Sequence, residues 1–313
     1  MSMSGTSWFL QNDTCLRADK VPPDAEYHRV YAGAGRRIGR GLIAIAALIA
    51  GLVIFAQICL AAASAIDTHL LGRTGFTPLQ FAAGSLSLAL LIPYSMVLQR
   101  WLYGLPARSL HSVAGRFRFG VFGRALLAFG PLLLVVMSVG VFLTPDDAIV
   151  WSKADLVAFF VIGMTLTPLA AAGEEYGLRG LMFRVIGSWT GGPRSGAALG
   201  IVVTTVVFSV LHGSLAPYIL GSYLVLFGSM AIITWRTGGL EIAVVLHGVY
   251  NVSALGLAMM LHLDIGADLG SRGQTVGTPV NLVPSVGILI ITGIIWWSTS
   301  KSGPVRTPPI ANE

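Results

Sequence analysis

The chain has 313 residues, of which 54% are hydrophobic and only 11% are charged. Soluble domains usually carry about 25% charged residues, so the composition excludes an ordinary soluble protein and places most of the chain in lipid. The net charge is +6, but the sequence has no basic stripe with interleaved aromatic residues, the pattern that nucleic-acid binding would require. We therefore expect the lipid bilayer, and no nucleic acid, among the partners of this protein.

Several uncharged runs reach the roughly 20 residues that a helix needs to cross a bilayer. They predict an all-α polytopic bundle of about eight transmembrane helices over residues 39–300, with cytoplasmic tails at 1–38 and 301–313. We expect the tails to be poorly ordered, and residues 264–284, which are rich in Gly, Thr and Pro, to form a loop. The runs are Gly41–Ile66, Thr74–Gln99, Ala125–Pro145, Leu156–Gly173, Ser195–Leu211, Leu215–Trp235, Ile242–Leu261 and Val283–Thr299.

The basic residues predict the orientation of this bundle. When eight spans are drawn, nearly all of the 20 Lys and Arg residues fall on one side, and the basic side of a membrane protein faces the cytoplasm. Both termini are therefore predicted to be cytoplasmic. Arg outnumbers Lys 17 to 3, which is typical of a GC-rich bacterial genome and predicts a bacterial plasma membrane. Cys15 lies in the tail and Cys59 in a span, so we expect no disulfide between them.

Charged and polar residues inside spans are informative, because a charge at the bilayer centre costs about 3 kcal/mol on insertion scales. The first such motif is Glu174-Glu175-Tyr176-Gly177-Leu178-Arg179. Glu175 and Arg179 are four residues apart on one helical face and can pair, which leaves Glu174 as the carboxylate that is free to handle a proton. Ordinary interfacial charge at a helix end is the alternative.

Two further motifs follow on separate spans. Phe208 and His212 are four residues apart, as are His247 and Asn251. His247 and Asn251 can present two donors on one face to a developing oxyanion, whereas packing residues or hydrogen bonds between membrane helices are the simpler explanations. A Glu, two His and an Asn on three spans together predict one polar cavity. Glu174 and His212 would activate water there, and the set Glu174, His212 and His247 would equally suit a catalytic zinc ion.

These motifs, in this order, resemble the signature of the CPBP family, the CAAX proteases and bacteriocin-processing enzymes also called Abi. The signature is Glu-Glu-x-x-x-Arg, Phe-x-x-x-His and His-x-x-x-Asn, and it covers residues 156–262 here. The resemblance implies a type II CAAX prenyl endopeptidase-like enzyme acting on a membrane-associated protein or peptide. It implies that Glu174 and His212 activate water and that His247 and Asn251 bind the oxyanion, with zinc or without a metal.

Other functions remain open on the sequence. A non-catalytic bacteriocin-immunity or scaffold protein of the same family would keep the motifs for packing, and a transporter could also carry an intramembrane carboxylate. The sequence lacks the His-Glu-x-x-His, Gly-x-Ser-Gly and Gly-x-Gly-Asp motifs of other intramembrane proteases.

The depth of the site presents a difficulty. Glu174 and His212 reach one level only if the helix of Glu174 continues through Ile186. His247 would still lie about 10 Å closer to the membrane edge, so we expect a water-filled cavity or a broken helix to close the gap.

Overall fold

The computed structural model describes residues 10, 20–33, 37–143, 149–271 and 273–309. The described residues form helices and loops, and eight helical segments are long and apolar enough to cross a membrane. This confirms the predicted all-α bundle. The helices are α1 (Ile38–Leu70), α2 (Pro78–Ala89), α3 (Leu91–Tyr103), α4 (Phe119–Phe142), α5 (Lys153–Glu174), α6 (Phe183–Gly187), α7 (Pro193–Leu211), α8 (Pro217–Thr237), α9 (Glu241–Met260), α10 (Ile265–Ser271) and α11 (Val283–Ser298).

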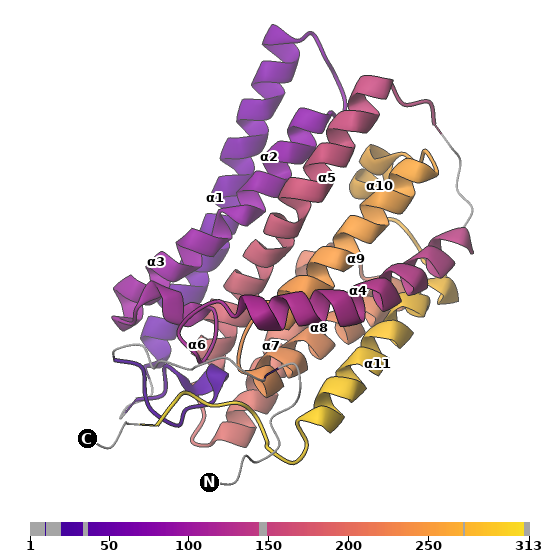
Figure 1. The fold of residues 1–313 in the computed structure, drawn as a ribbon. Coiled ribbons are helices and arrows are strands. Elements are labelled where there is room, and N and C mark those ends of the chain that lie inside the picture. Colours follow the sequence, from indigo (N-terminus) through magenta and orange to yellow (C-terminus); the bar gives the residue numbers. More distant parts are fainter. Residues whose placement is uncertain (1–9, 11–19, 34–36, 144–148, 272, 310–313) are drawn as a thin grey trace.

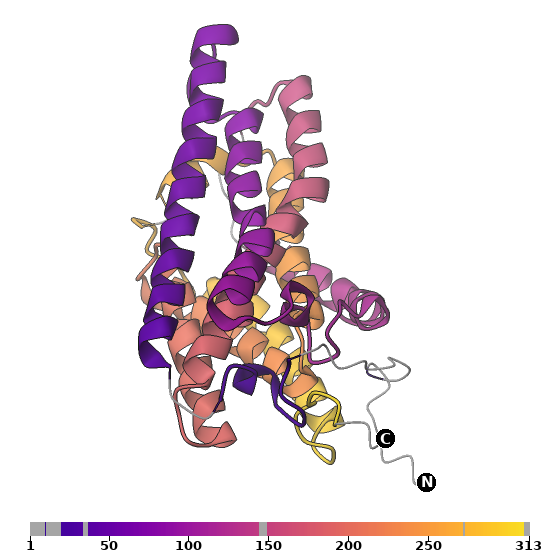
Figure 2. The ribbon, with the colours of Figure 1, turned by 90° about the vertical axis from the view of Figure 1, so that its left-hand side faces the viewer.

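Helices α1, α2 and α5 stand side by side and extend furthest from the end of the bundle where the two termini lie (Figures 1 and 2). Helix α5 packs against both α2 and α9, and α9 also packs against α4, which crosses it steeply (Figure 1). Helices α7, α8 and α11 complete the second half of the bundle. Helices α5 and α9 are thus the central pair between the two halves.

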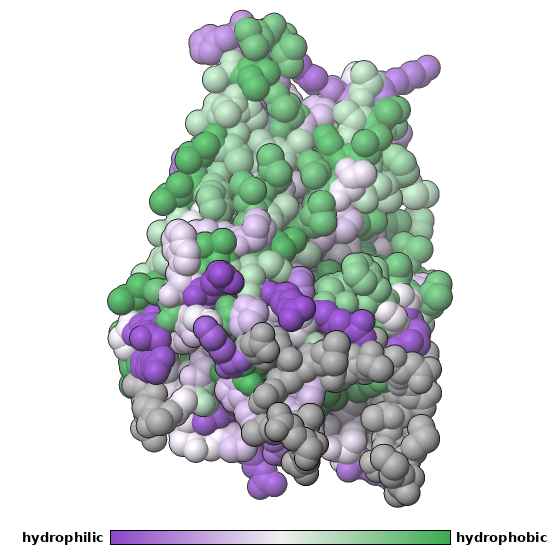
Figure 3. Space-filling view, turned by 60° about the vertical axis from the view of Figure 1, so that its left-hand side comes forward, coloured by the Kyte–Doolittle hydropathy of each residue, from purple (hydrophilic) through white to green (hydrophobic). Residues whose placement is uncertain are grey.

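The outer surface of the bundle is largely apolar, as contact with lipid requires. Hydrophobic side chains cover most of the upper part of the face in Figure 3, whereas hydrophilic ones gather in its lower part and, in smaller number, at the upper tip. Trp101, Trp189, Trp235 and Trp296 lie at or just beyond the ends of α3, α6, α8 and α11. Tryptophan is enriched at membrane–water interfaces, so this position near helix ends is typical of helices that span a membrane.

The second span is broken, which the sequence analysis missed. Helix α2 ends at Ala89 and α3 begins at Leu91. Pro93 explains the break, because it has no N–H to donate to the carbonyl of Ala89 four residues earlier. The expected loop at 264–284 also contains helical turns, in α10 and at Pro279–Leu282.

The helix that carries the acidic motif is longer than its uncharged run. Beyond Glu174 it continues through a π-helical segment, Glu175–Met182 (η4), and then through α6 to Gly187. This confirms the continuation that the depth of Glu174 required. Wide π-helical turns are rare and often occur at functional sites.

The position at which α9 begins explains how His247 reaches the level of Glu174 and His212, and α9 itself is unbroken. The turn between α8 and α9 does not lie at the surface, since Thr237, Leu240 and Glu241 have no exposed surface. Residues 109–118 and 303–307 cover it, and the amides of Leu240 and Val305 bond to the carbonyls of His111 and Arg236. Helix α9 therefore begins inside the protein, and His247 lies deeper than a surface turn would allow.

The tails also differ from the expectation of disorder. Residues 20–33 and 303–309 pack against each other, with reciprocal backbone bonds from Asp24 N–H to Thr307 O and from Thr307 N–H to Ala25 O. Tyr27 from this clasp is fully buried and donates to Leu110 O. Residues 1–9, 11–19 and 310–313, with Cys15 among them, lie outside the described residues; Cys59 is a free thiol on α1.

Gly173 allows α2 and α5 to approach each other closely beside Glu174. A Cβ atom at Gly173 would lie 1.9 Å from the carbonyl oxygen of Leu88. We expect Gly173→Ala to push the helices apart and to cost about 1–3 kcal/mol, seen as a lower melting temperature in detergent. Gly256→Ala on α9 is the control, because open space surrounds its Cβ position, and it should stabilise the helix by about 0.5–1 kcal/mol. Equal shifts for both variants would contradict this explanation.

His28 makes the clasp sensitive to acid. Burial lowers the pKa of His28 from 6.5 to about 4, against the raising effects of its bond to Pro193 O and of Glu26; Arg29 adds to the lowering. The unfolded chain binds this proton near pH 6.5, so the stability contribution is complete above that pH and is lost as pH falls toward about 4. We expect the melting temperature to fall more steeply over this range in the wild type than in His28→Gln, which cannot titrate. Parallel pH curves would refute the assignment.

Candidate active site

The three motifs meet inside the bundle. Glu174 ends α5, His212 follows the last residue of α7 and His247 lies in the second turn of α9. One ligand atom from each of these residues lies within 4.8 Å of the other two. The sequence analysis had assigned these residues to one cavity, and the structure brings them together.

His247 contacts both carboxylates of the acidic pair. Its Nδ1 lies 2.9 Å from Glu175 Oε1, and its Nε2 lies 3.4 Å from Glu174 Oε2. Because a carboxylate accepts a hydrogen bond, we place a proton on Nδ1. In the neutral imidazole, Nε2 then carries the lone pair and faces a second acceptor. A proton or a cation between these two atoms would relieve their repulsion.

His212 is oriented in the same way. Its Nδ1 lies 3.0 Å from the carbonyl oxygen of Phe208, one turn earlier. A carbonyl oxygen can only accept, so Nδ1 carries the proton and Nε2 keeps its lone pair. Both histidines therefore have Nδ1 fixed by an oxygen, the arrangement that usually orients histidine ligands of metals.

Glu175 and Arg179 form the predicted ion pair, and Glu175 also contacts His247. Both side chains are fully buried, and Arg179 Nη1 donates to Glu175 Oε1 at 2.9 Å. The same oxygen accepts from His247. Glu175 therefore joins the η4 segment to α9 and fixes the ring of His247, besides pairing within its own helix.

Phe208 and its neighbour Phe227 pack against the guanidinium of Arg179. The two rings stack with centroids 3.9 Å apart, and the Arg179 guanidinium carbon lies 4.0 Å from the centroid of Phe208. Arg179 Nη2 also donates to Phe227 O. The sequence analysis missed Phe227, because one aromatic residue in an apolar span carries no pattern that distinguishes it.

Asn251 lies one turn beyond His247 on α9 and is half-buried. The spacing of four residues places both side chains on the same helical face. Its role in binding an oxyanion stays a prediction.

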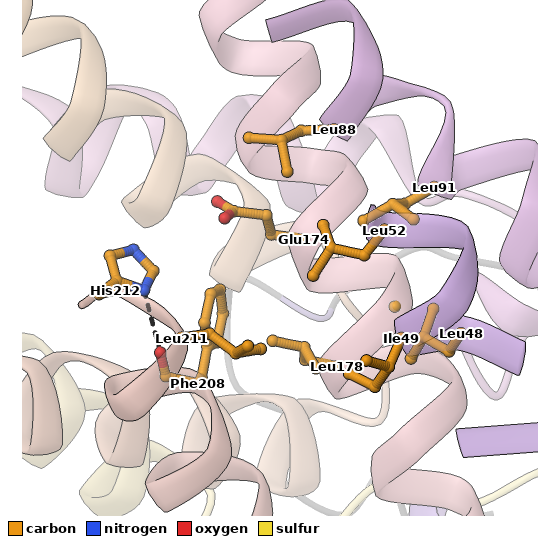
Figure 4. A pocket seen from close by; sticks show the side chains of 11 residues that line it. Leu48, Ile49, Leu52, Leu88, Leu91, Glu174, Leu178, Phe208, Leu211 and His212 are labelled. Carbon is orange, nitrogen blue, oxygen red and sulfur yellow. Dashed lines mark hydrogen bonds between the residues drawn. The ribbon is translucent and has the colours of Figure 1, made fainter. Parts of the chain in front are cut away.

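A cavity of about 260 Å³ adjoins the polar cluster. In Figure 4 the Glu174 carboxylate and the His212 imidazole point toward the same space, while leucine and isoleucine side chains of α1 line the opposite wall. The lining residues are Leu48, Ile49, Leu52, Leu88, Leu91, Glu174, Gly177, Leu178, Phe208, Leu211 and His212. The cavity can therefore hold an apolar group against two groups able to transfer protons.

The two glutamates are expected to differ in their effect on stability. Glu175→Gln would leave the buried Arg179 cation without its carboxylate, at a cost of about 3–5 kcal/mol. The Glu174 side chain is 17% exposed, so Glu174→Gln should change stability little. Thermal unfolding of both variants in detergent measures the difference. Similar melting temperatures would show that Glu175 does not have this structural role.

Residues 154–253 match the model of a protein family described as type II CAAX prenyl endopeptidase Rce1-like. The matched segment contains all three motifs, and it confirms the family resemblance seen in the sequence. No curated protein and no solved structure matches the chain. The chain thus carries an Rce1-like domain, a domain of a protease family, within a bundle of helices able to span a membrane.

Proposed function

We propose that this protein is an intramembrane endopeptidase that hydrolyses a peptide bond in a membrane-associated protein or peptide. The observation that carries the proposal is the convergence of Glu174, His212 and His247 within 4.8 Å of one another, with Glu174 and His212 at the wall of an apolar cavity. A carboxylate and two imidazoles inside a membrane protein are energetically costly. A role in hydrolysis accounts for their presence there.

In the proposed reaction Glu174 accepts a proton from water, which then attacks the peptide carbonyl. The Nε2 lone pair of His212 faces the same space and assists in orienting that water. As the tetrahedral intermediate forms, charge develops on the carbonyl oxygen, and Asn251 and a protonated His247 donate to it. The buried carboxylate of Glu175 holds the ring of His247 in place. Glu174 then returns its proton to the leaving amine.

The same three side chains fit a zinc ion. One carboxylate and two imidazoles, each imidazole with Nδ1 bonded to an oxygen, make up the donor set of an open catalytic zinc site. When bound, the metal would lower the pKa of a coordinated water toward neutrality. Glu175 and the carbonyl of Phe208 would then hold the two imidazoles in the ligating orientation.

The cavity supports a substrate that brings an apolar group. The α1 wall of Leu48, Ile49 and Leu52 offers a surface for a lipid anchor or an apolar segment beside Glu174. A peptide that carries a prenylated cysteine followed by three residues is therefore the first probe to test. The same peptide without the prenyl group measures how much the apolar wall contributes.

We expect Glu174→Gln and His212→Gln each to lower kcat for an internally quenched version of this peptide by at least about 100-fold. His69→Gln, at the exposed far end of α1, is the control and should keep full activity. Cleavage is followed by fluorescence and the product by mass spectrometry. Full activity in the folded Glu174→Gln protein would refute the hydrolytic assignment.

Metal dependence is a separate prediction, testable on the same preparation. If zinc is held by Glu174, His212 and His247, treatment with 1,10-phenanthroline abolishes cleavage and added Zn²⁺ restores it. If the reaction is metal-free, the chelator leaves the rate unchanged, and elemental analysis finds less than one metal ion per chain. The two results assign Glu174 the role of ligand or of base.

A further inference from the structure

The segment Ser109–Arg118, between α3 and α4, touches two of the three helices that carry the site, the helix of Glu174 and the helix of His247. On one side it packs on the helix of Glu174. A Cβ at Gly180 would lie 3.3 Å from Leu110, and Arg184 Nη2 donates to Ser109 O at 2.7 Å. His111 Nδ1 bonds to the hydroxyl of Tyr176, two residues beyond Glu174.

On its other side the segment holds the turn that begins the helix of His247. Val113 N–H donates to Gly238 O at 2.8 Å, and Leu240 N–H donates to His111 O at 3.0 Å. Arg118 then binds Glu241, the first residue of α9, through its backbone N–H, Nε and Nη2 at 2.7–2.9 Å. Its Nη1 donates to Thr237 O at 3.0 Å.

The Arg118–Glu241 pair is the strongest of these contacts. The side chains are 3% and 0% exposed, so water does not screen their attraction, and both charges are matched by several hydrogen bonds. Glu241 also lies in the first turn of α9, where the helix dipole stabilises a negative charge. The pair thus fixes where α9 begins, six residues before His247.

We infer that residues 109–118 form a positioning bracket that sets the spacing between Glu174 and His247, with Arg118 and Glu241 as its principal positioning residues. The inference rests on the proposed hydrolytic function. It is independent of the three motifs, because Arg118 and Glu241 lie outside the catalytic cluster and touch no reacting atom. A fixed spacing matters because a displacement of about 1 Å can cost a reaction on the order of 100-fold in rate.

The experiment uses the full chain in detergent and three variants. Arg118→Lys keeps the charge but loses the planar fork, and Glu241→Gln keeps the shape but loses the charge. The double variant Arg118→Met with Glu241→Met removes both buried charges together, so no unpaired charge opposes folding. Arg73→Lys is the control, because Arg73 also pairs with a carboxylate, Nη2 alone contacting both oxygens of the partly exposed Asp155, at the end of α5 opposite to Glu174.

Two readouts are made, amide hydrogen exchange and cleavage of the prenylated quenched peptide. We expect the double variant to fold and its amides within residues 241–250 to exchange faster than in the wild type, with little change elsewhere. Its kcat should fall on the order of 100-fold, with KM nearly unchanged. Arg118→Lys should lose kcat to a lesser extent, and Arg73→Lys should match the wild type. Wild-type exchange and wild-type kcat in a folded double variant would overturn the inference.

The exchange readout separates this inference from the proposed function. If the wild type does not cleave the peptide, the hydrolytic proposal fails, whereas exchange within residues 241–250 still decides the bracket. Faster exchange there in the double variant supports the bracket, and unchanged exchange overturns it. A general loss of protection throughout the protein would assign Arg118 and Glu241 to overall stability and would also overturn it.

Discussion

The buried carboxylate of Glu175 ties the site together. One of its oxygens accepts from Arg179 on its own helix and from His247 on α9. A carboxylate without exposed surface is tolerated only when its charge is matched, and Arg179 supplies that match while Oε2 of Glu175 has no hydrogen-bond partner among the described residues. Any arrangement that moved α9 away from the η4 segment would remove one of the two donors to Oε1. The two helices are therefore held together by this buried hydrogen bond as well as by packing.

Different partners orient the rings of the two histidines in the same way. A backbone carbonyl fixes Nδ1 of His212, and a buried carboxylate fixes Nδ1 of His247. The carbonyl is neutral, whereas the carboxylate is charged and also pairs with Arg179. The two rings thus have the same atom fixed, by partners of different charge.

The sequence predicted the helices and the polar cluster because both follow from the cost of polar groups in lipid. Glu174, His212 and His247 stand out in apolar runs, and the spacing of four in the pairs Glu175–Arg179, Phe208–His212 and His247–Asn251 carries the geometry. The sequence did not predict Phe227 within α8, Arg118 in the loop before α4 or Glu241 at the start of α9. Arg118 and Glu241 are 123 positions apart and follow no periodic pattern, and loops are normally expected at the surface. The break before α3 could have been predicted from the sequence, since Pro93 marks it.

The clasp between residues 20–33 and 303–309 gives the chain an order of assembly. Its hydrogen bonds join Asp24 and Ala25 to Thr307, and Thr307 leaves the ribosome only after α11 has been made. The part of the cover over the α8–α9 turn that Val305 supplies is therefore added after α11. A newly inserted bundle passes through a stage in which every span is present while this turn is only partly covered. Biosynthesis thus separates insertion into the bilayer from maturation of the enzyme.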